Sequence, residues 1–290
     1  MNKSLTIVIV TYNSRHLIED CLASIFRYND LGDSLNVVVV DNDSPQQNET
    51  FEFVKKTYPE VKCISSPKNG GYGYGNNVGF RNSSSDYFIV MNPDVRFIRP
   101  ILKDIVLKME NNKTMGMAGV SFTDGSRSCY IKPEALSTWT MTKEYILKAT
   151  PKYNQRMHYL SGSFLIFRSD AYRAAGGFDE SIFMYFEEAD ISNRIISCGY
   201  DVVLLKETEV QHLAHNREVK TQLIKFERDS LEYYCHKYGC DLKKLLSLWR
   251  AYFKLTKFIS LVLNQKLRVQ RAQAYIDIFC KPISEGSSSK

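Results

Sequence analysis

The sequence predicts an α/β protein with a mostly parallel central sheet, followed by a C-terminal helical tail. Short apolar, β-branched runs alternate with stretches of helical periodicity along most of the chain, an alternation typical of βαβ units. Acidic and polar residues directly follow several of these runs, where parallel sheets bind ligands. With 290 residues, 44% of them hydrophobic, the chain can bury one large core or two small ones.

The charge is unevenly distributed along the chain. The net charge is +6, but residues 241–290 hold ten basic and three acidic residues, and the remainder is nearly neutral. This distribution argues against nucleic acid as a partner and predicts an anionic partner for the tail. The first residues lack the features of a signal peptide, and the seven cysteines show neither disulfide nor zinc spacing. We therefore expect a cytoplasmic protein with reduced cysteines.

The first half of the chain shows strands and helices in alternation. Ser14 precedes a run of helical spacing and is a plausible N-cap. The second strand ends in the polar run Asp41–Pro45. The predicted elements are, in order, a strand at Leu5–Val10, a helix around Leu17–Ile25, a strand at Val37–Val40, a helix at Glu49–Tyr58 and a strand at Val61–Ser65.

A glycine-rich stretch, Asn69–Gly79, follows the third strand. Its spacing matches neither G-x-G-x-x-G nor a phosphate-binding P-loop. So many glycines indicate either a backbone brought close to a flat or polyanionic ligand, or a flexible surface loop.

The stretch from Asp86 to Val95 predicts a buried strand that ends in an acidic turn. Tyr87–Met91 is continuously apolar, as in a strand buried on both faces. Pro93 must end that strand, which places Asp94 at its carboxyl end. The alternative is an ordinary strand-ending turn.

Acidic residues recur before a later helix. Glu187, Glu188 and Asp190 lie within four residues of one another and next to aromatic side chains, where partial desolvation can make a carboxylate a useful base. An exposed helix start is the alternative, and Asp190 and Arg194 have the spacing of an intrahelical ion pair. The elements predicted around this helix are a helix at Ile101–Asn111 and strands at Met115–Phe122, Tyr159–Phe167 and Asp201–Leu205.

Two histidines follow the last strand. His212 and His215 would point to opposite faces of an extended segment, so at most one can reach a common site.

The tail combines an apolar stripe with basic residues. Its uncharged run, Phe258–Gln265, is too short to span a bilayer. Two interpretations are open: a helix lying in an anionic membrane surface, with Leu245, Trp249, Tyr252 and Phe253 in the lipid, or a helix docked on the body. The stripe consists of Leu242, Leu245, Leu246, Trp249, Tyr252, Phe253, Ile259 and Leu263, and the basic face of Lys243, Arg250, Lys254 and Lys257.

Together these motifs resemble the family-2 inverting glycosyltransferases, whose fold is the nucleotide-sugar-binding GT-A fold. The Asn92-Pro93-Asp94 variant is most similar to rhamnosyltransferases of bacterial surface polysaccharide synthesis. The matching stretches are Val8–Ser14, Val39–Ser44, Asn69–Gly79, Met91–Val95, Gly176–Arg194 and Val210–His212.

The resemblance implies a role for each matching residue. Thr11 and Asn13 would line the nucleotide pocket, and Asp41 would accept a hydrogen bond from a pyrimidine base. Asn69 and Asn77 would hold the glycine-rich loop against the nucleotide. The metal would be Mg²⁺ or Mn²⁺ bridging the diphosphate, with Asp94 and His212 as its ligands. Glu188 takes the place of the catalytic base, with Asp190 as the fallback.

Two departures from the family pattern bear on these roles. Asn92 replaces the first acid of the family's D-x-D, which removes an anionic metal ligand, and Glu188 replaces an aspartate. The implied domains are a nucleotide-sugar-binding half (1–100), an acceptor-binding and catalytic half (101–239), a basic helical tail (240–283) and a disordered end (284–290).

The implied activity is inverting transfer of a sugar, with L-rhamnose favoured, from a dTDP- or UDP-sugar to a polyprenyl-diphosphate-linked saccharide. The enzyme would work on the inner face of the cytoplasmic membrane, in O-antigen or capsule synthesis. A nucleotidyltransferase and a catalytically inert sugar-nucleotide-binding scaffold are the alternatives. The nucleotidyltransferase would normally show a basic glycine-rich loop, and Asn69–Gly79 contains no basic residue.

Overall fold

The computed structural model describes residues 3–45, 47–148, 152–213 and 220–281, and the chain divides into two compact units. The segment expected to be disordered, 284–290, lies outside the described residues. The unit boundaries differ from the expected domains because the chain leaves the first unit at Ile131 and returns at His158. The first unit comprises Met1–Tyr130, His158–Phe183 and Glu187–His215, and the second Ile131–Met157, Met184–Phe186 and Asn216–Lys290.

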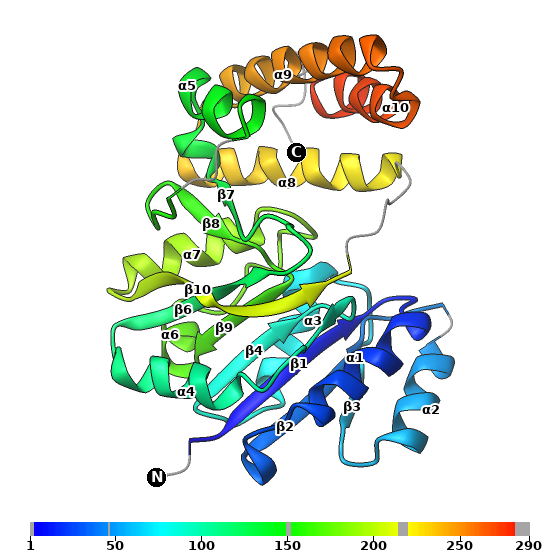
Figure 1. Ribbon diagram of the computed structural model, residues 1–290, viewed down its shortest axis with the longest axis vertical. Coiled ribbons are helices and arrows are strands. Elements are labelled where there is room, and N and C mark those ends of the chain that lie inside the picture. The colour runs from blue at the N-terminus through cyan, green and yellow to red at the C-terminus, as the bar shows by residue number, and fades with distance from the viewer. Residues whose placement is uncertain (1–2, 46, 149–151, 214–219, 282–290) are drawn as a thin grey trace. The chain divides into compact units, whose positions relative to one another are not determined.

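The first unit holds a large sheet and its covering helices (Figure 1). Its strands are β1 (Leu5–Thr11), β2 (Leu35–Asp41), β3 (Lys62–Ser65), β4 (Tyr87–Met91), β5 (Val95–Arg96), β6 (Met115–Phe122), β8 (His158–Leu160), β9 (Phe164–Arg168) and β10 (Asp201–His212). Its helices are α1 (Arg15–Arg27), the short η1 (Gly32–Ser34), α2 (Gln47–Thr57), α3 (Gly71–Arg81), α4 (Leu102–Asn111), α6 (Ser169–Ala174) and α7 (Glu187–Ser197).

The main sheet has the strand order β3-β2-β1-β4-β9-β6-β10-β5. Strands β1 to β4 pair in parallel, as do β6 and β10, so the expectation of a mostly parallel sheet is confirmed. Strand β9 runs antiparallel between β4 and β6, and β5 runs antiparallel to β10. The parallel arrangement brings the carboxyl ends of β1, β2 and β4 to one edge of the sheet.

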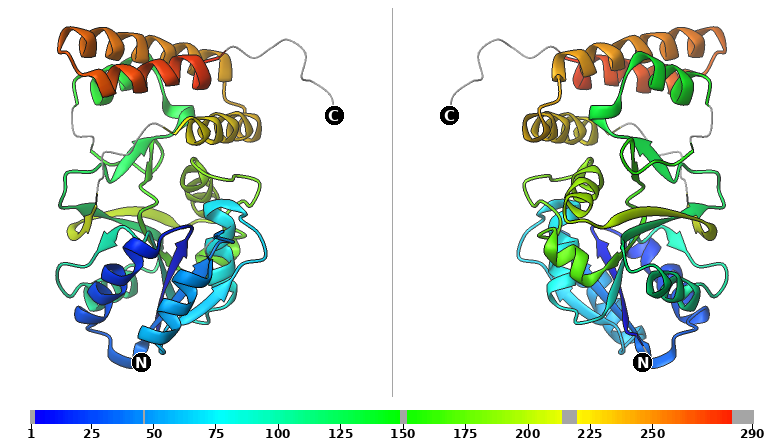
Figure 2. Two further views of the ribbon diagram at one scale, coloured as in Figure 1. Left: turned by 90° about the vertical axis from the view of Figure 1, so that its right-hand side faces the viewer. Right: turned by 90° about the vertical axis from the view of Figure 1, so that its left-hand side faces the viewer.

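Helices cover both faces of this sheet, as Figure 2 shows. Alternate residues of β1, such as Ile7 and Ile9, belong to one apolar core with side chains of α1 and α4. The intervening Val8 and Val10 lie against α3. Because central strands such as β1 and β4 are buried on both sides, their sequences are almost continuously apolar, and this is why these strands could be predicted so closely.

The structure corrects the interpretation of the glycine-rich stretch. Residues Gly71–Arg81 form helix α3, which is neither a ligand-cradling loop nor a flexible one. A Cβ on Gly79 would lie 2.2 Å from Cγ1 of Val8, and one on Gly75 would lie 2.7 Å from Cγ1 of Val10. The glycines therefore let the helix backbone approach strand β1 closely, which no larger residue would permit.

Two smaller expectations also need correction. Ser14 stands at the N-cap of α1, but its side chain makes no capping bond and instead donates to the carbonyl of Tyr12. The strand predicted at Tyr159–Phe167 is two strands, because β8 pairs with β7 (Cys129–Ile131) in a separate small sheet while β9 joins the main sheet. A local apolar pattern does not reveal such a change of partner.

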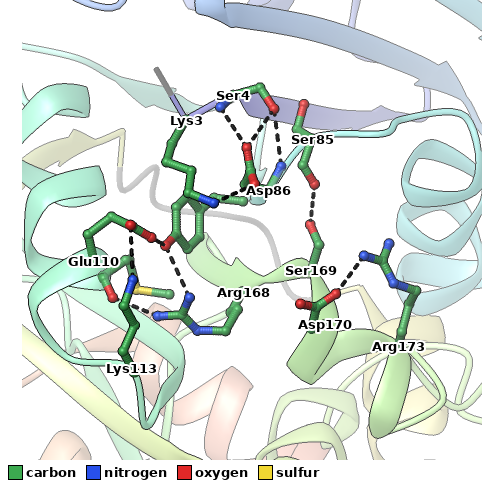
Figure 3. A network of polar contacts seen from close by, with 12 residues as sticks. Lys3, Ser4, Ser85, Asp86, Glu110, Lys113, Arg168, Ser169, Asp170 and Arg173 are labelled. Atoms are coloured by element: carbon green, nitrogen blue, oxygen red, sulfur yellow. Dashed lines mark hydrogen bonds and ion pairs between the residues drawn. The ribbon is translucent and has the colours of Figure 1, made fainter. Parts of the chain in front are cut away.

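A polar network fastens the amino ends of the central strands (Figure 3). Asp86, just before β4, accepts from Lys3 Nζ at 2.9 Å and from the backbone of Ser4 at 3.0 Å. Arg168 donates to the hydroxyl of Tyr87 at 3.1 Å. Since Asp86 precedes β4 and Asp94 follows it, these charges stabilise the strand end opposite the candidate site.

The second unit is helical, and an aromatic cluster joins its helices. Trp249 contacts the rings of Tyr145 and Phe279, and Phe253 stacks on Tyr275 at 4.6 Å. The side chains once expected to enter a membrane thus pack inside this unit, so the docked interpretation holds for the first part of the tail. Its elements are η2 (Pro133–Ala135), α5 (Thr138–Met141), η3 (Thr142–Ile146), α8 (Thr221–Tyr238), α9 (Leu242–Val262), α10 (Lys266–Ala274) and η4 (Tyr275–Phe279).

No helix within the described ranges combines the length and the apolarity needed to cross a bilayer.

Candidate active site

The carboxyl ends of β1 and β2 carry the first candidate residues. Asp41 is buried, and its carboxylate accepts from the backbone N–H and hydroxyl of Ser44 at 3.0 and 2.7 Å. The hydroxyl of Thr11 lies 3.4 Å from the same carboxylate. In this conformation Asp41 and Thr11 therefore shape the turn after β2.

The neighbouring loop presents Asn13 at the surface. Asn13 adopts a left-handed backbone with φ of 52°, which asparagine tolerates better than most residues. Its N–H donates to Ser44 Oγ at 2.9 Å, and its side chain is exposed. Of the residues expected to line the nucleotide pocket, Asn13 is thus the one with a side chain open to a ligand.

The side chains of Asn69 and Asn77 form hydrogen bonds with other groups of the protein. The amide oxygen of Asn69 accepts from Asn42 Nδ2 at 2.9 Å and from the N–H of Gly71 at 3.1 Å, which holds the start of α3. Asn77 is buried on α3, donates to the carbonyl of Phe178 at 2.9 Å and accepts from the hydroxyl of Tyr172 at 2.5 Å. Both residues position the segments next to the site.

Asp94 lies in the turn that follows β4, as expected from Pro93. Arg96 holds this turn, because its guanidinium donates to the carbonyls of Pro93 at 2.6 Å and Val95 at 2.8 Å. The guanidinium also donates to the carbonyl of Leu17 in α1 at 2.9 Å. A buried cation that satisfies three carbonyls fixes the backbone from which Asp94 projects.

The antiparallel pairing of β5 with β10 brings His212 to Asp94. His212 pairs with Val95 in register, and the N–H of Leu213 donates to the carbonyl of Asp94 at 2.9 Å. Nε2 of His212 consequently lies 3.7 Å from Oδ1 of Asp94. Two potential metal ligands that are distant in the sequence thus become neighbours. The second histidine of the segment, His215, lies outside the described residues.

The opposite ring nitrogen of His212 faces a hydroxyl and a carboxylate. Nδ1 lies 3.3 Å from Ser126 Oγ, and that hydroxyl donates to Asp124 Oδ2 at 2.5 Å. Because the hydroxyl proton goes to the carboxylate, Ser126 Oγ is left to accept from Nδ1–H. Nε2 then carries the lone pair on the side of Asp94, the tautomer that a metal ligand requires.

Glu188 lies at the start of α7 and is partly buried. Burial raises the pKa of its carboxyl group to about 7, although a hydrogen bond from the backbone N–H of Gly162 lowers it. A Cβ on Gly162 would lie 2.3 Å from Oε1 of Glu188, so only glycine leaves room for the carboxylate there. Tyr72 donates to the carbonyl of Gly162 at 2.5 Å and so holds the same segment.

The two acids that flank Glu188 have different surroundings. Glu187 is buried, and burial together with the neighbouring Glu188 charge raises its pKa well above the usual range. Asp190 is fully buried, and one of its oxygens accepts from Nε and Nη2 of Arg194 at 2.9 and 2.6 Å. The expected intrahelical ion pair is confirmed, and this geometry removes the basis for Asp190 as the fallback base.

Consecutive residues connect Glu188 to the Asp94–His212 pair. Gly162 contacts Glu188, and the next residue, Ser163, has its hydroxyl 3.3 Å from Nε2 of His212. The turn between β8 and β9 thus places Glu188, His212 and Asp94 around one short segment.

Sequence reasoning missed several residues of this arrangement. Ser126, Asp124, Ser163 and Arg96 act through contacts with segments far away in the chain, which a local pattern cannot reveal. The Ser161-Gly162-Ser163 turn was a visible signal, because two serines flanking a glycine inside an apolar strand indicate a break or a close backbone approach.

Two proteins named as rhamnosyltransferases align with most of this chain. N-acetylglucosaminyl-diphospho-decaprenol L-rhamnosyltransferase of Mycobacterium tuberculosis is 25% identical over 300 aligned residues, which cover 93% of this chain and 94% of that protein. Rhamnosyltransferase WbbL of Escherichia coli is 22% identical, over 72% of this chain and 83% of the relative.

Solved structures share the fold. The mannosyltransferase PcManGT of Pyrobaculum calidifontis, in complex with GDP-Man and Mn²⁺, superposes with a TM-score of 0.64 at 15% identity, covering 97% of this chain and 86% of that one. TarS of Staphylococcus aureus with UDP gives a TM-score of 0.56 at 13% identity, covering 95% and 90%. The expected GT-A type fold is thereby confirmed.

The family model described as Glycosyl transferase family 2 matches residues 6–176, more than half of the chain. That range includes β1 to β4, the Asp94 turn and the Ser161–Ser163 segment. The chain therefore belongs to glycosyl transferase family 2.

Proposed function

We propose that this enzyme is an inverting transferase that moves a sugar, with L-rhamnose favoured, from a dTDP- or UDP-sugar to a hydroxyl of a polyprenyl-diphosphate-linked saccharide. The process served would be the synthesis of a cell-surface polysaccharide, O-antigen or capsule, at the inner face of the cytoplasmic membrane. Two relatives named as rhamnosyltransferases support the sugar, and the diphospho-decaprenol in one of those names supports the acceptor class. Family membership favours transfer over the nucleotidyltransferase and scaffold alternatives.

One observation carries this proposal. A carboxyl group with a pKa near 7, Glu188, and a neighbouring carboxylate–imidazole pair, Asp94 and His212, are linked through Gly162 and Ser163. Sugar transfer from a diphosphate donor needs both: a base for the acceptor hydroxyl and a charge-neutralising site for the leaving group.

The Asp94–His212 pair fits a divalent cation. Two atoms that bind one ion at about 2.1 Å lie roughly 3 Å apart, and the pair is separated by 3.7 Å. An oxygen and an imidazole nitrogen suit a cation such as Mn²⁺. Within the described ranges no group of three or more His, Cys, Asp or Glu side chains converges as a metal site. A cation held by Asp94 and His212 would take its remaining ligands from the diphosphate and from water. The bound cation would neutralise the diphosphate leaving group.

Glu188 supplies the proton-transfer step. Its carboxylate takes the proton from the acceptor hydroxyl as the oxygen attacks the anomeric carbon, and the bond to the diphosphate breaks on the opposite side. Because one displacement occurs, the anomeric configuration inverts. A second carboxylate beside the bond, as in glycosidases, is not needed since the donor is already activated.

The Ser126–Asp124 pair is predicted to set the metal affinity. Ser126→Ala or Asp124→Asn should weaken Mn²⁺ binding by about 10–100-fold, because His212 loses the partner that fixes its tautomer. Electron paramagnetic resonance of Mn²⁺ in the presence of UDP measures this affinity. Asp104→Asn, which removes an exposed carboxylate on α4, is the matched control. Unchanged affinity in both site variants would mean that His212 does not depend on this pair.

The proposed reaction is tested by incubating the enzyme with single nucleotide sugars and a polyprenyl-diphosphate-linked GlcNAc acceptor, followed by mass spectrometry of the lipid. We expect a mass increase of one deoxyhexose with dTDP-L-rhamnose. Calorimetric titration with dTDP, UDP and GDP tests the donor class separately. Tight binding of GDP alone would contradict the pyrimidine donor, whereas a different added mass would contradict only the sugar.

A further inference from the structure

Exposed apolar side chains gather at one place in the second unit. Of fifteen large hydrophobic side chains that are exposed in the described ranges, seven lie between Leu255 and Leu267. This short stretch contains the turn from α9 to α10, so we call the seven residues the tip cluster. Its members are Leu255, Phe258, Ile259, Leu261, Val262, Leu263 and Leu267.

Helices α9 and α10 form a helical hairpin that leaves the tip cluster exposed. Helices α9 and α10 lie side by side (Figures 1 and 2), joined by a 2.6 Å hydrogen bond from Lys257 to Gln273. Phe253 of α9 also stacks on Tyr275, the first residue of η4 directly after α10. At 3.6 residues per turn, Phe253, Lys257 and the buried Ser260 share the face toward α10. The stripe formed by Leu255, Phe258, Ile259 and Val262 has the spacing of the opposite face.

The positive charge of the hairpin indicates an anionic partner. No acidic residue occurs between Asp241 and Asp277, and eight basic residues do. Near the tip, Lys254, Lys266, Arg268 and Arg271 are exposed. The exposed apolar side chains are thus flanked by basic residues and by no acidic ones. This combination matches a bilayer with acidic headgroups, whose surface is anionic and whose interior is apolar.

We propose that the tip cluster inserts into the headgroup–acyl boundary of an anionic membrane while the surrounding lysines and arginines contact lipid phosphates. The contact is interfacial, because the apolar stretch is too short to span a bilayer. It differs from the membrane contact expected from the sequence, which used Leu245, Trp249, Tyr252 and Phe253. The inference goes beyond sugar transfer and depends on neither the donor nor the acceptor.

Co-sedimentation of the full-length protein with vesicles tests this contact without donor or acceptor. Vesicles of phosphatidylglycerol and phosphatidylcholine are compared with phosphatidylcholine alone. We expect Phe258→Glu with Val262→Glu to lower the partition coefficient on anionic vesicles by about tenfold or more. Leu107→Glu is the matched control, since Leu107 is 58% exposed in the first unit and Phe258 and Val262 are 65% and 71% exposed. Equal binding by the double variant and the control would overturn the proposal.

A second measurement reports insertion directly. Phe258→Trp should shift the tryptophan emission to shorter wavelength on anionic vesicles, relative to the wild-type protein with its two tryptophans. No shift would overturn insertion. A second copy of the chain is the competing occupant: if light scattering shows a dimer that Phe258→Glu with Val262→Glu converts to a monomer, and vesicles bind neither form, the cluster is a dimer interface and the membrane assignment is wrong.

Discussion

Glu188→Gln is expected to lower the rate of sugar transfer by about 10²–10⁴-fold while leaving nucleotide-sugar binding nearly intact. Glutamine keeps the shape of the side chain but cannot accept the proton of the acceptor hydroxyl. The wild-type kcat/KM should rise with pH up to the pKa of Glu188, about 7, because the protonated carboxyl group below this pH is inactive as a base. Steady-state kinetics from pH 5 to 9 and calorimetric titration with UDP measure both effects.

Asp190→Asn provides the contrast within the same helix. Asp190 is fully buried and paired with Arg194, and breaking a buried ion pair typically costs about 3–5 kcal/mol of stability. This variant should therefore lower the melting temperature clearly, whereas Glu188→Gln should not. Near-native turnover of Glu188→Gln, together with a folded but inactive Asp190→Asn, would transfer the role of base to Asp190.

Asp94→Ala is expected to reduce transfer by about 10²-fold or more and to weaken cation-dependent donor binding sharply. A divalent cation at a leaving group contributes several kcal/mol of charge stabilisation, and each 1.36 kcal/mol is tenfold in rate. With the imidazole of His212 as its neighbouring ligand, the site should hold the cation loosely and exchangeably. The measurements are transfer rates in Mn²⁺ and Mg²⁺ titrations and calorimetry with UDP.

Chelation is the complementary experiment on the wild-type enzyme. Exhaustive EDTA treatment should abolish transfer, and added Mn²⁺ should restore it. Asp170→Asn, which removes an exposed carboxylate on α6 that pairs with Arg173, should leave both responses unchanged. Full activity after EDTA would remove the metal-binding roles assigned to Asp94 and His212.

The sequence alone determined most of the strands of the first unit and the place of the acidic turn. Strands buried on both faces must be continuously apolar, so Tyr87–Met91 could be delimited to the residue. The strand of small residues at Met115–Phe122 was also delimited correctly. Pro93 ends its strand because its ring nitrogen carries no N–H to donate to the sheet. The sequence therefore placed Asp94 at the carboxyl end of that strand. The resemblance carried by the motifs then predicted the family, and the match over residues 6–176 confirmed it.

Other features depended on contacts between distant segments, and the tertiary structure alone decided them. Gly75 and Gly79 of α3 are needed because Val8 and Val10 of β1 leave no space for a Cβ. His212 reaches Asp94 because β10 pairs antiparallel with β5. Among neighbouring acids, burial beside Arg194 makes Asp190 structural, whereas Glu188 stays partly exposed. Periodicity reports which residues avoid water, but the partner that shields each one is fixed only when the whole chain packs.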